Sequence, residues 1–101
     1  MELVEDVDAT TLTMRLRGEL DMATVPPFRE VLTSRIASRE FDTVVVDLGG
    51  LTFTDSAGLT ILVEANEQSR VHEVELVLTG VSRQVRKLME ITSLVDLFKI
   101  R

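Results

Sequence analysis

The chain has 101 residues, of which 45% are hydrophobic, and this suits one compact domain, spanning residues 1–101, with its own core. Its formal net charge is -6 and it has neither tryptophan nor tyrosine, which argues against a nucleic-acid-binding or anionic-membrane surface. It has no cysteine, which excludes disulfides and thiolate metal sites. The acidic start lacks the features of a secretory signal, so we expect a cytoplasmic protein with no direct nucleic acid and no membrane contact.

The chain begins with a predicted β-hairpin. Apolar residues over 3–7 indicate a short strand, and 8–10 should form a turn. Apolar and polar residues then alternate over 11–17, as in a strand with one face in the core. We expect this second strand to pair antiparallel with the first, to stop at Gly18, and to be followed by a loop over 18–22.

A helix and a buried strand should follow. Prolines favour the first turn of a helix, so Pro26 predicts a helix start, with Thr24 as its N-cap and an end near Arg39. The run over 42–48 does not alternate between apolar and polar residues, which predicts a strand covered on both faces. Gly49–Gly50 should then turn the chain.

The next predicted helix runs from Ser56 to about Arg70. One apolar stripe lies along it, and Leu59 and Val63 lie on another side. An apolar surface this wide indicates either deep burial or a second face that contacts a partner. The pattern alone leaves both possibilities open.

The remaining residues complete an α/β order. A strand over 75–79 ends at Gly80, a helix capped by Ser82 follows, and 94–100 should form a helical turn and a last short strand. Strands that alternate with helices imply a mixed β-sheet with parallel neighbours and helices packed against it. The strand-to-helix loops should meet at one edge of the sheet, where α/β proteins usually place their sites.

The loop before Ser56 carries the candidate site. Thr54, Asp55 and Ser56 are residue types that cap helices, and one interpretation is that Asp55 and Ser56 only cap the helix. Alternatively, Ser56 is also a phosphorylation site at the positive end of a helix dipole. A phosphate would add about -1.5 to -2 charge, which the helix favours and Asp55 repels, so its main effect would fall on a docked partner.

Two catalytic interpretations are weaker. Residues 54–58 are similar to the G-x-S-x-G nucleophile motif, but the only histidine, His72, should lie at the far end of the helix, about 20 Å from Ser56. Asp47 could be a phosphoacceptor, but that chemistry needs further carboxylates and a lysine close by. We therefore expect no catalytic residue, no metal and no cofactor.

These residues together resemble a known family, the STAS domain, and specifically the single-domain bacterial anti-sigma factor antagonists. The resemblance covers nearly the whole chain: G-E-L-D at 18–21, V-V-V-D-L at 44–48, F-T-D-S-A-G-L at 53–59, and the closing segment at 79–98. The D-S-x-G-L run after V-D-L is the most specific part. The resemblance implies a single-domain STAS fold.

The resemblance also implies a function. In such proteins an anti-sigma factor of the GHKL serine-kinase type phosphorylates the serine of the D-S-x-G motif, which is Ser56 here. The unphosphorylated antagonist binds the anti-sigma factor and frees the sigma factor, and a PP2C-type phosphatase restores this form; the antagonist is not an enzyme. The alternative is a non-enzymatic STAS scaffold subunit of a stress-sensing or lipid-transport assembly, in which Ser56 only caps the helix. The implied partner-binding residues are Asp21, Thr54, Asp55, Ser56, Gly58, Leu59, Thr60 and Val63.

Overall fold

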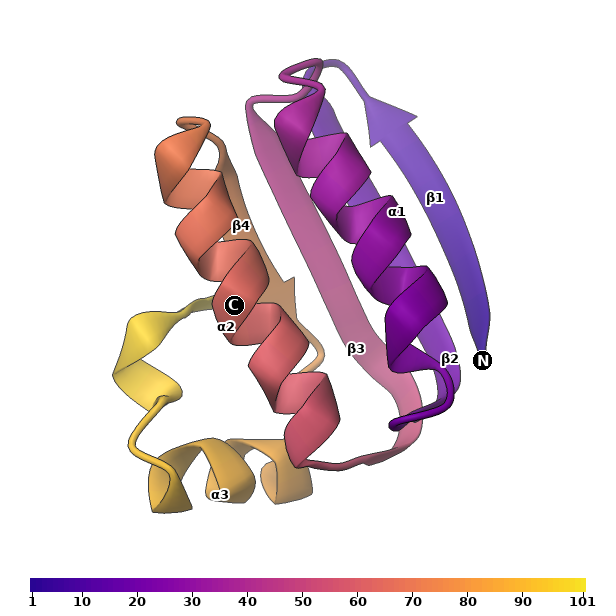
Figure 1. Ribbon diagram of the computed structural model, residues 1–101, viewed down its shortest axis with the longest axis vertical. Helices are drawn as coiled ribbons and strands as arrows, with labels where there is room; N and C mark the ends of the chain where they lie inside the picture. Colours follow the sequence, from indigo (N-terminus) through magenta and orange to yellow (C-terminus); the bar gives the residue numbers. More distant parts are fainter.

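The computed structural model describes residues 1–101 and has one five-stranded sheet with its strands in chain order, β1-β2-β3-β4-β5 (Figure 1). The β1–β2 pair is antiparallel and the other neighbours are parallel, which confirms the predicted mixed sheet. None of the helices is long and apolar enough to span a lipid bilayer. The elements are β1 (Glu2–Asp8), β2 (Thr11–Leu20), α1 (Val25–Ala37), β3 (Thr43–Thr54), α2 (Ser56–Val71), β4 (Glu75–Thr79), α3 (Arg83–Ile91), the 3₁₀ helix η1 (Val95–Leu97) and β5 (Lys99–Ile100).

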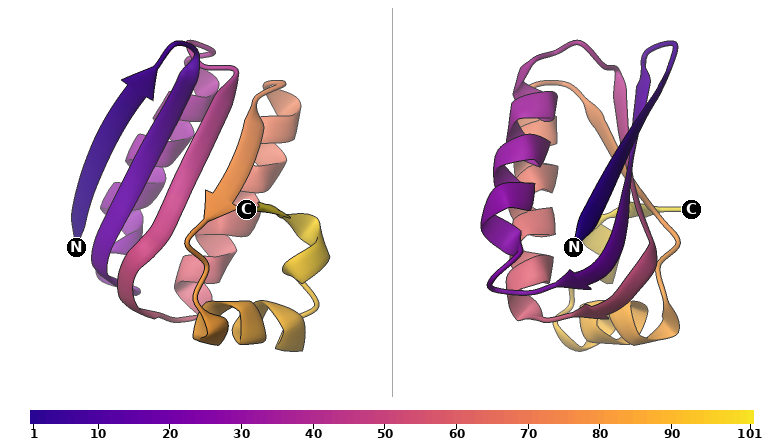
Figure 2. Two further views of the ribbon diagram at one scale, coloured as in Figure 1. Left: turned by 180° about the vertical axis from the view of Figure 1, so that it is seen from behind. Right: turned by 90° about the vertical axis from the view of Figure 1, so that its right-hand side faces the viewer.

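Helices α1 and α2 cover the same face of the sheet (Figure 2). The chain moves in one direction from β2 through β3 to β4, and crossovers of the same hand then place their helices on one side. No helix lies along the opposite face, yet the expectation that β3 is covered on both faces is confirmed over Val44–Val46, because all three residues are buried. Val45 and Val77, which are paired in register and lie outside the main core, are buried on this second face among the side chains of neighbouring strands.

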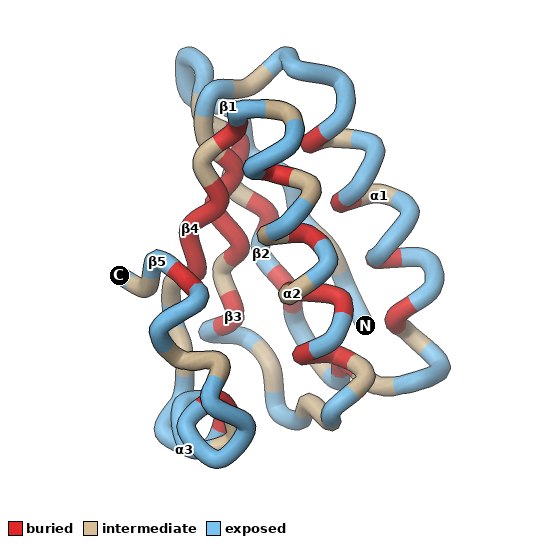
Figure 3. Tube along the Cα trace, turned by 60° about the vertical axis from the view of Figure 1, so that its left-hand side comes forward, coloured by how far each residue is buried: buried red, intermediate tan, exposed pale blue.

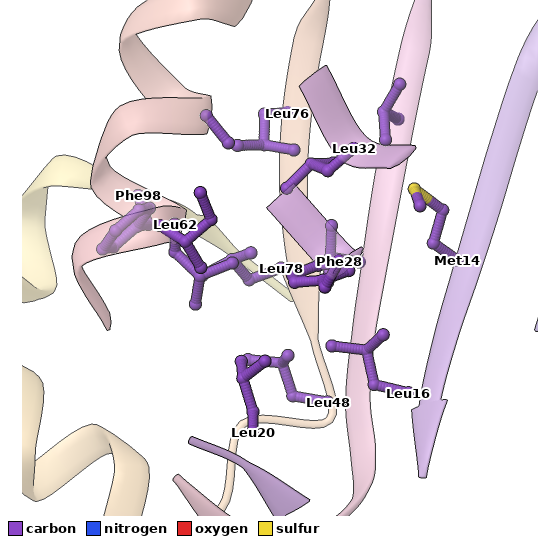
Figure 4. Close-up of a cluster of buried hydrophobic side chains, with 14 of the residues drawn as sticks. Met14, Leu16, Leu20, Phe28, Leu32, Leu48, Leu62, Leu76, Leu78 and Phe98 are labelled. Atoms are coloured by element: carbon purple, nitrogen blue, oxygen red, sulfur yellow. The ribbon is translucent and has the colours of Figure 1, made fainter. Parts of the chain in front are cut away.

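The core lies between the sheet and the two long helices, and its buried positions follow their inner faces (Figures 3 and 4). Alternate residues of β2 face the helices, and α1 meets them with residues spaced by four. Each fully buried leucine-sized side chain contributes about 1.5–3 kcal/mol to the hydrophobic stabilisation. The β2 and α1 residues in this layer are Leu12, Met14, Leu16, Phe28, Leu32 and Ile36.

Both central strands are longer than the sequence predicted. β2 continues through Gly18 to Leu20, and β3 continues through Gly49–Gly50 to Thr54, so the predicted strand end and the predicted turn are wrong. A Cβ on Gly50 would lie 2.5 Å from the Leu16 carbonyl oxygen, so this glycine permits close approach of the two strands. The pairing shifts register twice here and resumes, which carries both strands to the same edge of the sheet.

The C-terminal segment packs across the end of the sheet (Figure 1). Helix α3 begins with the predicted cap, since Ser82 Oγ accepts a hydrogen bond from the Val85 amide at 3.2 Å. Val85 and Met89 are its buried residues. The predicted helical turn and last strand are confirmed as η1 and β5.

Candidate functional site

The junction between β3 and α2 presents Ser56 to solvent. Asp55 has extended backbone geometry, and its Oδ1 accepts hydrogen bonds from the amides of Ala57 at 2.9 Å and Gly58 at 3.2 Å. Asp55 is therefore the N-cap of α2, and Ser56 is the first helical residue. The Ser56 side chain is exposed, and its hydroxyl makes no hydrogen bond within the chain. The cap fixes the serine backbone and leaves the hydroxyl free for reaction.

Gly58 holds the first turn of α2 against the ends of both central strands. A Cβ at this position would lie 2.2 Å from Thr54 Oγ1 and 3.1 Å from side-chain carbons of Leu20. No larger residue fits unless the Thr54 and Leu20 side chains move or the helix shifts. The glycine of the D-S-x-G motif thus has a packing role, and it is buried, so it supports the surface from beneath.

The loop after β2 is organised by Asp21. Its Oδ1 accepts hydrogen bonds from the Ala23 amide at 3.0 Å and the Thr24 amide at 3.2 Å. The Thr24 hydroxyl donates to the Glu19 carbonyl and accepts from the Asp21 amide, both at 2.9 Å. Thr24 is the N-cap residue of α1, as predicted, but it makes no side-chain cap hydrogen bond, because this hydroxyl faces back into the loop.

Two loops are neighbours: the loop after β2 that begins at Asp21 (the Asp21 loop) and the junction of β3 and α2 at Asp55 and Ser56 (the serine loop). Leu20 and Thr54 are partners at the ends of the parallel pair β2–β3, and the Asp55 amide donates a hydrogen bond to the Leu20 carbonyl at 3.4 Å. The residues that follow these partners, Asp21 and Asp55, therefore lie at one edge of the sheet. This edge is where parallel strands place their functional loops.

The α2 residues predicted to contact a partner divide into two groups. Leu59 is 2% exposed and belongs to the core, so the prediction that it lies on a contact face is wrong and deep burial is the correct alternative. Val63 is half-buried, and Thr60 is exposed with its hydroxyl donating to the Ser56 carbonyl at 2.9 Å. Apolar periodicity does not distinguish a core position from a contact position, because both are apolar.

Two exposed apolar side chains were missed by the sequence analysis. Met22 follows Asp21 in the loop and is 79% exposed, and Phe53 lies near the end of β3 and is 50% exposed. Large apolar residues on polar loops near a candidate site are a usable sequence signal for a binding surface. Met22 lies in the Asp21 loop, and Phe53 lies in β3 just before the serine loop.

The geometry opposes serine hydrolase chemistry. His72 caps the C-terminal end of α2, and a helix of 16 residues is about 24 Å long, so His72 is distant from Ser56 at the other end. Asp47 lies within β3 and not at its end; its Oδ1 accepts from the Gly49 amide at 2.8 Å and its other oxygen lies 3.8 Å from Arg15 Nε. Asp47 therefore has structural partners, and His72 is too far from Ser56 to act as its base.

Comparison with known proteins identifies the family. The sequence profile of the STAS domain matches residues 2–101. The chain belongs to the STAS family. The anti-sigma-B factor antagonist of Staphylococcus aureus (strain NCTC 8325 / PS 47) is 36% identical to it over 87 residues, which is 86% of this chain and 80% of the relative. The anti-sigma-B factor antagonist of Listeria monocytogenes is 32% identical over 98 residues, which is 97% of this chain and 85% of the relative.

Solved structures show the same fold. The anti-sigma factor antagonist SpoIIAA in its unphosphorylated form superposes with a TM-score of 0.79 at 21% identity, covering 99% of this chain and 87% of that chain. The phosphorylated form of Bacillus SpoIIAA gives a TM-score of 0.78 at 22% identity, covering 99% and 91%. At this level of identity the similarity establishes the arrangement of strands and helices of this STAS protein.

Proposed function

We propose that this STAS protein is an anti-sigma factor antagonist, a binding module whose affinity for an anti-sigma factor is set by phosphate on Ser56. The observation that carries the proposal is the exposed, unpartnered Ser56 hydroxyl at the start of α2, directly after its capping residue Asp55. The relatives from Staphylococcus and Listeria are anti-sigma-B factor antagonists, which supports it. The chain itself is a substrate and a ligand, not an enzyme.

A phosphate on Ser56 would act on the partner more than on the domain. The amides of Ala57 and Gly58, which could otherwise bind an anion at the helix N-terminus, already donate to Asp55. The phosphate would have to displace the Asp55 carboxylate or stay in solvent beside it, and charge repulsion favours the second arrangement. A docked partner would then have to desolvate a nearly dianionic group, which weakens the complex.

The proposed contact surface surrounds the serine. Thr60 and Ser56 are exposed, and Asp21, Thr54, Asp55 and Val63 are partly exposed, so these residues can touch a partner directly. Met22 and Phe53 add apolar area at its border, and exposed apolar anchors are typical of binding hot spots. Gly58 and Leu59 act beneath the surface, where they position the first turn of α2.

The partners follow from the chemistry of the switch. An anti-sigma factor of the GHKL serine-kinase type would place ATP so that Ser56 Oγ attacks the γ-phosphorus. The bond between this phosphorus and the bridging oxygen breaks, ADP leaves, and the serine proton passes to a base on the kinase. A PP2C-type phosphatase would hydrolyse the phosphoserine. These partners act on transcription, so the proposed location is cytoplasmic.

A charge-matched pair of variants tests the proposal. Ser56→Asp places a carboxylate at the switch, and Ser34→Asp places the same charge on the exposed surface of α1. We expect Ser56→Asp to bind the purified anti-sigma factor at least about tenfold more weakly than wild type, and Ser34→Asp to bind equally well. With ATP, the kinase should add one phosphate to wild type and none to Ser56→Ala. Equal binding of Ser56→Asp and wild type would favour the scaffold-subunit alternative.

A further inference from the structure

The last five residues of β3 have one unpaired backbone edge. The β3–β4 pairing ends with Asp47 opposite Thr79, after which β4 stops, while β3 continues to Thr54 with β2 as its only neighbour (Figure 2). The segment over 50–54 reads G-L-T-F-T and contains neither charge nor proline. Exposed edges are usually protected from further pairing by such residues or by a covering element. This edge is open to another strand.

A groove lies along the open edge. Its volume is about 280 Å³, and it lies between the end of β3 and α3, which crosses the base of the molecule (Figure 1). Apolar side chains from both elements line it, together with three hydroxyls and one amide, as in sites that bind a peptide through side chains and backbone together. On β3 the lining residues are Leu51, Thr52, Phe53 and Thr54, and in the α3 region they are Ser82, Gln84, Val85 and Leu88.

The cations of α3 lack acidic partners. Of the 11 lysines and arginines, seven form ion pairs with carboxylates, which leaves four without one. Three of these four, Arg83, Arg86 and Lys87, are exposed on α3, and the fourth is Arg39. Arg83 and Lys87 are one turn apart on α3, the helix that forms one wall of the groove. In a chain of net charge -6, this is a local cationic site next to a neutral strand edge.

We propose that this groove binds an extended acidic segment of a partner protein, which adds as a strand to residues 50–54 of β3 and places carboxylates near Arg83 and Lys87. Five strand residues span about 17 Å, enough for the backbone of a short peptide to pair along the edge. A second copy of this chain fits less well, because edge-to-edge pairing would bring two sets of α3 cations together. The proposal does not depend on the phosphorylation of Ser56.

A defined peptide tests this surface. The probe is an N-acetylated octapeptide of alternating valine and glutamate, titrated into ¹⁵N-labelled protein to millimolar concentration. We expect amide shifts confined to residues 50–54 and 82–88. The double reversal Arg83→Glu/Lys87→Glu should weaken binding at least about fivefold, whereas Arg39→Glu/Arg70→Glu, equal in charge and distant along the chain, should not. The amide spectrum of each variant reports that it is folded.

Two further peptides separate charge from strand pairing. The same octapeptide N-methylated at alternate residues cannot pair along a strand edge, and the valine–lysine octapeptide has the wrong charge; both should bind at least about fivefold more weakly. Absence of shifts, shifts outside the two segments, or equal binding of either control peptide would overturn the proposal. Shifts at 50–54 that depend on protein concentration without peptide would also overturn it, because they would assign the edge to self-association.

Discussion

The substitution Gly58→Ala is a sharp test of how the serine is positioned, because two effects of opposite sign compete. At an ordinary helical position, alanine stabilises a helix by about 1 kcal/mol relative to glycine. At this position the added Cβ would lie 2.2 Å from Thr54 Oγ1 and 3.1 Å from Leu20 carbons. Overpacking of this kind costs typically about 1–3 kcal/mol. The difference of the two effects is about 0–2 kcal/mol, so we expect Gly58→Ala to lower the free energy of unfolding by up to about 2 kcal/mol.

The assay is urea unfolding of a double-mutant cycle with Thr54→Ala. The Thr54 hydroxyl makes one long hydrogen bond, 3.4 Å to the Asp55 carbonyl, so its removal alone should cost little. Removing it relieves the closest contact of the new Cβ, so the double variant should recover about 1 kcal/mol relative to the sum of the single changes. A Gly58→Ala protein more stable than wild type, or a cycle with no coupling, would refute the close packing of α2 on β3.

Three further substitutions test the cap, the core and an ion pair. Asp55→Ala removes the side chain that accepts the Ala57 and Gly58 amides, and should lower the free energy of unfolding in urea by about 1 kcal/mol. Leu59→Ala should cost about 2–5 kcal/mol by the same measurement, because Leu59 is a core residue; a loss below about 1 kcal/mol would place it on the surface. The pKa of Glu5 is lowered, chiefly by hydrogen bonds from Arg35. The pair therefore stabilises the fold at pH values above the ordinary glutamate pKa, and this stabilisation is lost as the pH falls through the lowered pKa. Glu5→Gln should therefore lose less stability than wild type between about pH 6 and pH 3, and identical pH profiles would contradict this.

Local chemistry made part of the site predictable from the sequence. Asp55 directly before an amphipathic run is a cap signal, and the cap depends only on hydrogen bonds within one helical turn. Ser82 was predicted in the same way, and its bond to the Val85 amide is equally local. The alternation in β2 reports its one-sided burial, because side chains in a strand point to opposite faces in turn.

The errors arose where one residue type serves two purposes. Glycine is typical of turns, yet Gly50 lies inside β3 because it allows the backbone of β2 to approach closely. Leu59 is apolar in either of two settings, and only the position of α2 over the sheet determines which applies. The open edge over 50–54 depends on where the neighbouring strand ends, which no periodicity in β3 itself can report.

The most direct measurement is calorimetric titration of the anti-sigma factor with wild-type protein, first unphosphorylated and then carrying one enzymatically added phosphate mapped to Ser56. This titration tests phosphoserine itself, whereas the Ser56→Asp variant replaces it with a carboxylate. We predict that the phosphorylated protein binds at least about tenfold more weakly, a difference of about 1.4 kcal/mol, and that treatment with the phosphatase restores the original affinity. Equal affinity of the two forms would contradict the proposed switch and leave Ser56 with its structural place at the start of α2.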